Sequence, residues 1–165
     1  MKERSLNMLL VGMFLFILMA IMMILFLYRA DEKFENNITV TESGVTESVL
    51  KVQDLTLVPG TRRDYHVNLI CDATGNYYIH LDYEEVHDGG MKHFVNVRIM
   101  LGDDEVYYGP LTELIDEDYI VTFEGILDHL DPLVLSFYYE MPIETGNEAQ
   151  GTSADFDINL TIEKN

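Results

Sequence analysis

The hydrophobic residues of this 165-residue chain follow two different patterns. Residues 8–28 form one unbroken apolar run without a charged side chain. At about 1.5 Å per helical residue, such a run reaches about 30 Å, the thickness of the hydrocarbon core of a bilayer. A buried core helix would show a polar stripe every 3.6 residues, and this run shows none. The sequence therefore predicts a single N-terminal transmembrane helix over residues 8–28 that contacts the lipid bilayer.

The charges flanking the run predict its orientation. Lys2 and Arg4 precede it, whereas Arg29 follows it and is at once outweighed by acidic residues. Because the more cationic flank stays in the cytoplasm, we expect residues 1–7 to be cytoplasmic and the chain beyond the helix to be extracellular. Residues 29–36 are polar and charged and are predicted to form a short stalk. The expected localisation is the cell membrane, as a single-pass protein.

We interpret the run as an uncleaved signal-anchor. A cleavable signal peptide has a shorter apolar core and ends at a site of small residues. Here the core has spanning length, and the only candidate site, Tyr28-Arg29-Ala30, places a bulky tyrosine where a small residue is needed.

Beyond residue 36, apolar and polar residues alternate with the period of a half-buried β-strand. The clearest case is the C-terminal strand, in which Phe156, Ile158 and Leu160 alternate with polar residues such as Asp157. Similar alternation predicts strands near residues 38–41, 49–57, 61–71, 77–84, 95–101, 105–108, 119–123 and 133–141, with one helical turn near 111–115. Eight or so short strands and no long helical period predict a mostly β fold over residues 37–165, an antiparallel jelly-roll-like β-sandwich.

Three irregularities interrupt the alternation. The apolar phase slips at Gln53-Asp54, which predicts a bulge or bend. Pro59-Gly60 predicts a turn, because proline fixes φ and glycine accepts positive φ. Residues 87–90, with the sequence His-Asp-Gly-Gly, predict a hairpin or loop.

Charge excludes one class of partner. The chain has a net charge of −19, and residues 1–29 contribute +2, which leaves −21 on the remainder. A nucleic-acid partner is excluded because the basic footprint is missing. The acids have two explanations, namely solubility at a surface or the collection of Ca²⁺ or a basic partner. The candidate acidic clusters are Asp82-Glu84-Glu85, Asp103-Asp104-Glu105, Asp116-Glu117-Asp118 and Asp128 with Asp131, and the second and third are the best candidates for Ca²⁺.

No pattern of catalytic residues stands out. There is no H-E-x-x-H pair, no G-x-S-x-G elbow and no glycine-rich phosphate loop. The only cysteine, Cys71, excludes an intramolecular disulfide and alternates with inward residues, which predicts a buried thiol. We therefore predict no enzyme activity, no catalytic residue, no cofactor and no metal site. The residues considered were the five histidines at 66, 80, 87, 93 and 129, and the outward tyrosines Tyr78, Tyr107 or Tyr108, and Tyr138, which are candidates for binding.

Residues 141–151, Met-Pro-Ile-Glu-Thr-Gly-Asn-Glu-Ala-Gln-Gly, are followed at 153–158 by the strand Ser-Ala-Asp-Phe-Asp-Ile. This C-terminal third resembles the TasA/camelysin family of surface-exported proteins, with weaker support from Leu55-x-Leu57-x-Pro59-Gly60. In the loop, Gly146-Asn147 tolerates positive φ, and the Gln150 amide is suited to pairing with loop backbone groups. The N-terminus departs from the family pattern, because members usually carry a signal that is removed by a signal peptidase.

The resemblance implies a jelly-roll fold and a structural role in the extracellular, biofilm-type matrix. The first hypothesis is therefore a membrane-tethered, surface-displayed structural or adhesion module, with possible self-association or a protein partner at the cell surface. An accessory binding subunit of a membrane complex is the second. A metallopeptidase, an activity attributed to some family members, is the third, and no zinc motif supports it.

Overall fold

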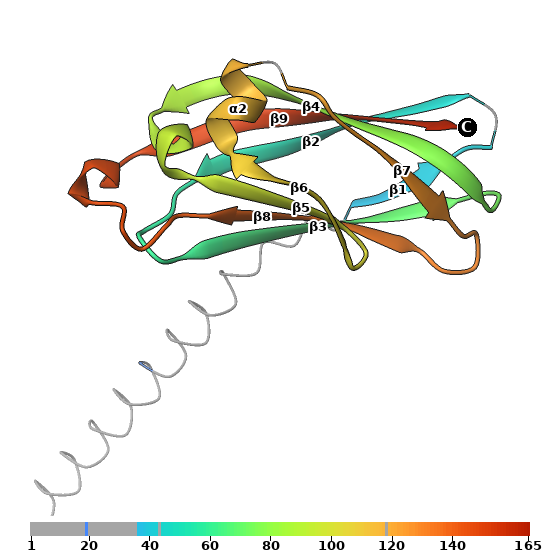
Figure 1. Ribbon diagram of the computed structural model, residues 1–165, viewed down its shortest axis with the longest axis horizontal. Coiled ribbons are helices and arrows are strands. Elements are labelled where there is room, and N and C mark those ends of the chain that lie inside the picture. The colour runs from blue at the N-terminus through green and yellow to red at the C-terminus, as the bar shows by residue number, and fades with distance from the viewer. Residues whose placement is uncertain (1–18, 20–35, 43, 118) are drawn as a thin grey trace, which may run out of the picture. The chain divides into compact units, whose positions relative to one another are not determined.

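The computed structural model describes residues 19, 36–42, 44–117 and 119–165 (Figure 1). The chain divides into two units, residues 1–33 and 34–165. In the first unit only Met19 is described, and it is helical. The predicted transmembrane run and stalk therefore lie outside the described residues, except at Met19 and Asn36. Within the described part, no helix combines the length and the apolar character needed to cross a membrane.

The second unit is a β-sandwich, as the alternating sequence predicts. Its two sheets have the strand orders β1-β3-β8-β5-β6 and β2-β9-β4-β7. The strands are β1 (Asn36–Val40), β2 (Val45–Leu55), β3 (Arg62–Cys71), β4 (Gly75–Gly89), β5 (Asn96–Leu101), β6 (Asp104–Pro110), β7 (Val121–Leu127), β8 (Leu133–Glu140) and β9 (Ser153–Lys164). Three short helices join them, namely η1 (Met91–Phe94), α2 (Leu111–Asp116) and η2 (Asn147–Ala149).

Strands β2 to β9 form four nested antiparallel pairs. The first strand of this set pairs with the last (β2 with β9), then β3 pairs with β8, β4 with β7 and β5 with β6. Further ladders join β4 to β9 and β5 to β8, so each set of four strands becomes one sheet. Strands distant in sequence are thus neighbours in space.

Strand β1 differs from the wholly antiparallel arrangement that we expected. It pairs in parallel with β3, so that Ile38 lies opposite Leu69. Strand β2, which lies between them in sequence, belongs to the other sheet. The chain therefore reverses direction twice before it returns beside β1, and this makes the β1–β3 pair parallel.

The core lies between the sheets and is built from the inward residues of the alternation. In β9, Phe156, Ile158 and Leu160 are all buried, as predicted. An aromatic cluster forms at the centre, where the Phe156 ring lies 5.4 Å from that of Tyr139 and 5.6 Å from that of Tyr83. The Tyr83 and Tyr139 hydroxyls are 3.3 Å apart, so each buried phenol has a partner. Burial raises the pKa of both hydroxyls, which therefore stay neutral.

Two of the predicted irregularities are confirmed. The β2–β9 register shifts between Val52 and Leu55, and Asp54 adopts a left-handed backbone with φ of 50°. The Asp54 N–H donates to Asp155 Oδ1 at 2.8 Å, which holds the bulge against β9. Gly60 has φ of 79°, and the Thr61 N–H donates to Val58 O at 3.0 Å, as the predicted turn requires.

Two other sequence predictions are wrong. Residues 87–90 were expected to form a loop, but β4 continues to Gly89 after a register shift and keeps its pairing with β9. Tyr119 was expected at the start of a strand, but β7 begins at Val121 and Tyr119 is exposed. In the first place a local turn signal, and in the second local alternation, misjudged how far a strand extends, because pairing with the partner strand decides it.

Candidate functional site

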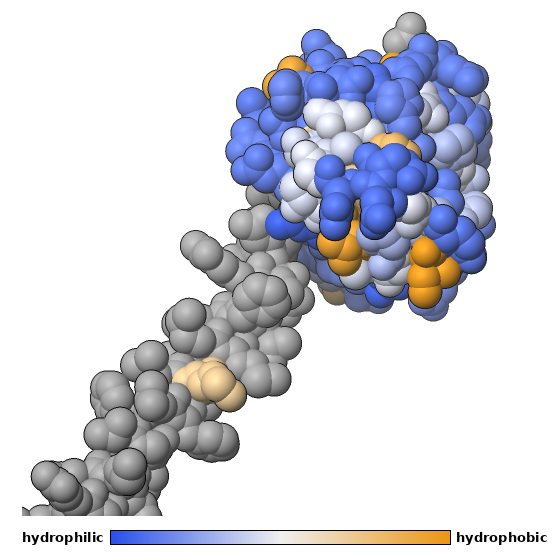
Figure 2. All heavy atoms as spheres, turned by 90° about the vertical axis from the view of Figure 1, so that its left-hand side faces the viewer, coloured by the Kyte–Doolittle hydropathy of each residue, from blue (hydrophilic) through white to orange (hydrophobic). Residues whose placement is uncertain are grey.

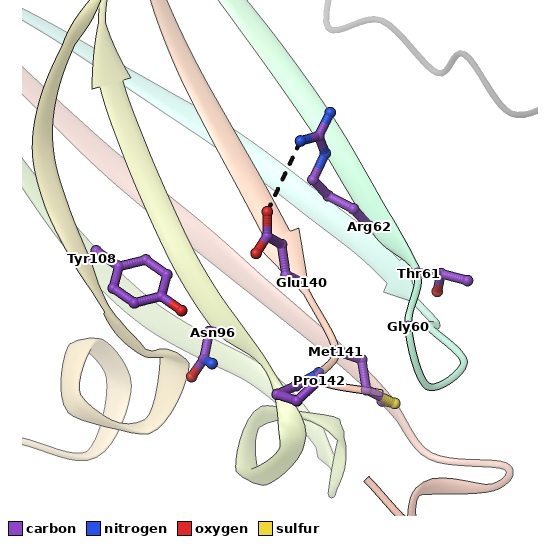
Figure 3. A pocket seen from close by; sticks show the side chains of 8 residues that line it. All are labelled: Gly60, Thr61, Arg62, Asn96, Tyr108, Glu140, Met141 and Pro142. Carbon is purple, nitrogen blue, oxygen red and sulfur yellow. Dashed lines mark ion pairs between the residues drawn. The ribbon is translucent and has the colours of Figure 1, made fainter. Parts of the chain in front are cut away.

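The candidate site is a groove at the end of the sandwich where β3 begins and β8 ends. There the register places three residues side by side across the outer face of the five-stranded sheet, Arg62 opposite Glu140 and Glu140 opposite Asn96. These residues border a hollow of about 430 Å³. It is lined by Gly60, Thr61, Arg62, Asn96, Tyr108, Glu140, Met141 and Pro142 (Figure 3).

A second hollow of about 310 Å³ adjoins the first, with Asn96 and Pro142 in the walls of both. Its other lining residues are His93, Phe94, Val95, Pro110, Glu144, Thr145 and Glu148. We call the two hollows together the end groove. Figure 2 looks onto this end of the sandwich and shows a mostly hydrophilic surface with scattered hydrophobic side chains.

Two sequence motifs meet in the walls of the end groove. The Gly60 N–H donates to Met141 O at 2.9 Å, and the Met141 N–H donates to Thr61 O at 3.0 Å. The Pro59-Gly60 turn is thereby tied to the start of the loop at residues 141–151. That loop, residues 141–151, also lines the second hollow. The tertiary structure thus brings together two motifs that are distant in sequence.

Arg62 is held in place at one side of the groove. Its Nη2 donates to Asp64 Oδ2 at 3.0 Å, and its Nε lies 2.7 Å from Asp64 Oδ1 as an ion-pair contact. The guanidinium also lies over the Tyr138 ring, 4.8 Å from its centroid. Its Nη1 is 3.9 Å from Glu140 Oε1, the contact drawn as a dashed line in Figure 3. The contact with Asp64 raises the pKa of Arg62, which remains charged.

Tyr108 forms the opposite side of the groove. The Arg98 guanidinium lies 5.1 Å from the centroid of the Tyr108 ring and covers one of its faces. The Tyr108 side chain nevertheless remains 52% exposed, and in Figure 3 its hydroxyl points toward Asn96. Within the described residues, neither the Tyr108 hydroxyl nor the side-chain amide of Asn96 forms a hydrogen bond with another residue. Both groups can therefore bond a ligand.

A second group of charged side chains surrounds Lys92, near the junction of β4 and η1. The Lys92 ammonium is 2.6 Å from Glu85 Oε2, 2.7 Å from Asp116 Oδ1 and 3.4 Å from Asp88 Oδ2. Its side chain is 8% exposed, so the charge requires these partners. The cluster joins β4, η1 and α2. Hydrogen bonds to Asp116 and Glu85 raise the pKa of Lys92, while the Gly90 N–H and Lys92 lower that of Asp88. We assign this cluster a stabilising role.

The structure does not bring the predicted histidines together. His66 on β3 contacts Ser136 through Nδ1 at 2.9 Å, and His80 on β4 contacts Thr122 at 3.0 Å. His129 contacts Thr74 at 2.7 Å, whereas His87 and His93 are exposed. Among the described residues, no group of three histidine, cysteine or acidic side chains is placed to hold a metal ion.

The acidic clusters have separate local contacts. Asp116 contacts Lys92, Glu105 lies 3.3 Å from Arg98 Nε, and Asp128 accepts the Leu130 N–H at 3.0 Å. The last contact lowers the pKa of Asp128. Asp82 and Glu84 lie on the same face of β4, whereas Glu85 lies on the other and contacts Lys92 at 2.6 Å. Asp118 lies outside the described residues.

Cys71 and most of the candidate tyrosines lie where the sequence predicts. Cys71 is buried, as predicted, and burial raises the pKa of its thiol. Tyr78, Tyr108 and Tyr138 lie on outer faces, whereas Tyr107 packs against the core. Of these rings, Tyr108 and Tyr138 belong to the end groove or its support, and Tyr78 lies on the other sheet.

The loop at residues 141–151 uses positive φ at a different glycine from the one whose tolerance was noted. Gly146 has φ of −81°, and the positive φ occurs at Gly151, with 76°. The Thr152 hydroxyl donates to Ala149 O at 2.7 Å and closes the loop. Gln150 contributes its backbone N–H, which donates to Asn147 O at 3.0 Å.

Sequence reasoning missed Lys92 and Asn96, and it named Tyr108 only together with Tyr107. Asn96 lies at the start of an alternating stretch and has no motif of its own. Lys92 could have been found as an apolar-flanked cation in a strongly acidic domain, since Met91 and Phe94 also belong to η1. Its partners could not, because they come from two other elements, β4 and α2.

The sequence matches no protein-family model and no curated protein. Among solved structures, the chain is similar to the pre-peptidase C-terminal domain of a Bacillus anthracis collagenase, with 9% identity and a TM-score of 0.35 over 76% of this chain and 95% of that one. It is also similar to an insecticidal delta-endotoxin of Bacillus thuringiensis, with 10% identity and a TM-score of 0.39 over 78% of this chain and 25% of that one. A third is PliG of Aeromonas hydrophila, a periplasmic lysozyme inhibitor, with 11% identity and a TM-score of 0.36 over 78% and 98%. Likenesses this distant carry no argument about function.

Proposed function

We propose that this protein is a membrane-tethered, surface-displayed structural or adhesion module whose extracellular domain is a jelly roll. The observation that carries the proposal is the order of two parts along the chain. An uncharged apolar run of spanning length, residues 8–28, directly precedes a β-sandwich that closes its own core. A fold with its own core next to an anchor is suited to presenting a surface outside a membrane.

The strand order supports the jelly-roll part of the proposal. Two four-stranded sheets, β2-β9-β4-β7 and β3-β8-β5-β6, arise when a long hairpin of nested pairs is rolled into a sandwich. Strand β1 adds to the edge of the second of these sheets. The resemblance of residues 141–158 to the TasA/camelysin family supports the same fold and a role in the extracellular matrix.

The surface of the domain supports display in water. The chain beyond residue 29 carries a net charge of −21, and Figure 2 shows a face on which hydrophobic side chains are scattered. Strong negative charge keeps neighbouring copies soluble and repels anionic lipid headgroups. This charge is therefore suited to a domain displayed in water.

Anchoring and orientation can be tested together. In cells that express the full chain with an epitope tag at each terminus, we expect the protein in the membrane fraction. Protease added to intact cells should remove the C-terminal tag and spare the N-terminal tag, because Lys2 and Arg4 hold the N-terminus inside. Protection of the C-terminal tag would reverse the topology, and recovery in the soluble fraction would refute the anchor.

The proposal includes no enzymatic activity. The purified full chain, equilibrated with zinc and dialysed, should retain less than one zinc per molecule and should leave casein intact. The physical reason is that the described histidines each contact a separate part of the sandwich. Zinc-dependent cleavage that is lost when His66 or His80 is replaced by alanine would establish a hydrolase instead.

A further inference from the structure

We propose that the end groove binds a neutral polysaccharide chain, with Tyr108 and Asn96 as its principal contacts. This inference rests on the proposed function and names the ligand of the displayed surface. Its basis is the side chains that line the first hollow. They combine an exposed aromatic ring, an amide, a carboxylate and a guanidinium around a space of about 430 Å³. That volume lies in the range of small-molecule sites, about 300–1,000 Å³.

The chemistry of these groups matches a sugar ring. A pyranose presents a face of C–H groups, which packs against an aromatic ring, and a rim of hydroxyls, each both donor and acceptor. Tyr108 offers ring surface on the side that Arg98 leaves open. The planar Asn96 amide and Glu140 carboxylate lie on adjacent strands and are suited to bonding neighbouring hydroxyls.

The shape of the groove favours a chain of sugars over a single one. The second hollow, about 310 Å³, shares Asn96 and Pro142 with the first and extends past them toward Glu148. A ligand that spans both hollows would occupy consecutive subsites. Its binding energy would therefore increase with the number of sugar units until both hollows are filled.

Charge argues for a neutral ligand. Arg62 is already neutralised by its ion pair with Asp64, so it supplies a hydrogen-bond donor and little net charge. The second hollow carries Glu144 and Glu148, and the chain beyond residue 29 carries −21. A polyanion would be repelled on approach at low salt. Neutral hydroxyl-rich chains encounter no such barrier.

An extended peptide fits the end groove less well than a sugar chain does. Peptides add to sheets through a free strand edge. On the outer face at the groove, β8 lies between β3 and β5, and β5 lies between β8 and β6, so the backbone groups of β8 and β5 are already paired. The edge strand is β6, which contributes only Tyr108 to the first hollow. A peptide lying over β8 and β5 would have to bind through side chains alone.

The experiment uses the full chain in a detergent without a sugar headgroup. Isothermal titration is carried out with cellohexaose, laminarihexaose, maltohexaose and chitohexaose, and with polygalacturonate and hexalysine as charged probes. We expect at least one neutral hexasaccharide to bind, and its trisaccharide to bind more weakly. Tyr108→Ala and Asn96→Ala should each weaken the binding about ten-fold, from the loss of ring packing and of paired hydroxyl contacts.

Tyr78→Ala is the matched control, because Tyr78 is a half-exposed tyrosine on the outer face of the other sheet. It should leave the affinity unchanged, and near-ultraviolet circular dichroism should confirm that all three variants are folded. The proposal is overturned if no neutral hexasaccharide binds, if hexalysine alone binds, or if Tyr108→Ala binds as the wild type does. Failure of the topology experiment with intact sugar binding would refute the anchor and leave the groove assignment standing.

Discussion

Replacing Phe156 by alanine should lower the free energy of unfolding of the domain by about 3–5 kcal/mol. The Phe156 side chain is fully buried between the sheets and contacts the rings of both Tyr83 and Tyr139. Its removal leaves a cavity at the centre of the core, so the lost contacts add to the lost burial. The loss is a large part of the stability of a typical domain, about 5–15 kcal/mol.

The neighbouring residue provides the control. Asp157 lies on the outer face of the same strand, and its only recorded partner in the described part of the chain is Lys51, at 3.9 Å. Asp157→Ala should change stability by no more than about 0.5 kcal/mol, as most surface substitutions do. Thermal melts of the full chain, followed by the near-ultraviolet tyrosine signal, measure both. Equal shifts for the two variants would mean that the alternation of β9 is assigned to the wrong faces.

Replacing Lys92 by methionine should lower the free energy of unfolding by about 2–3 kcal/mol. Loss of one partner of a fully buried ion pair costs about 3–5 kcal/mol. The expected value here is smaller because Glu85, Asp88 and Asp116 all reach solvent. Without the ammonium, the carboxylates at 2.6 and 2.7 Å from its present position would repel each other.

Lys51→Met is the matched control, since Lys51 is 64% exposed and its acidic partner is 3.9 Å away. It should cost less than about 1 kcal/mol, the usual upper value for a surface ion pair. Urea unfolding of both variants gives the comparison. A stability equal to or above that of the wild type for Lys92→Met would show that the cluster does not stabilise the fold.

The dependence of the Lys92 effect on pH provides a second readout. A raised pKa means that the lysine's contribution is complete below its unfolded value of about 10.4 and is lost only as the pH rises through the folded value. In Lys92→Met, Asp88 would lose the ammonium that helps to lower its pKa, so the pKa of Asp88 in the folded state would rise. The variant would then release fewer protons on folding than the wild type, so its deficit should shrink as the pH falls from 7 toward about 4.

The alternation of apolar residues identified most of the strands and the faces they bury. Phe156, Ile158 and Leu160 are inside, Cys71 is buried, and the helical turn after residue 110 forms α2 (Leu111–Asp116). The phase slip at Gln53-Asp54 and the Pro59-Gly60 turn were also predicted from the sequence. These features depend on residues that are neighbours in the sequence, through the period of two, the fixed φ of proline and the conformational freedom of glycine.

The end groove was not predictable in the same way. The alternation of apolar and polar residues places Arg62, Glu140 and Asn96 on outer faces, but it does not predict that β8 lies between β3 and β5. These strands are separated by many residues in sequence, and only their register puts the three side chains in one row. In the loop at residues 141–151, the sequence identified Gly146-Asn147 as able to accept positive φ, and the structure has the positive φ at Gly151.

What the sequence determined by itself was therefore the apolar run at residues 8–28, the acidic mostly β domain that follows it, and the inward face of most of its strands. Tertiary structure alone decided the parallel pairing of β1, the meeting of two loops at the end groove, and the three carboxylates around Lys92. The physical reason is that burial along a strand depends on its own periodicity. Which side chains meet depends on pairing between segments distant in sequence, and many pairings are compatible with the same periodicity.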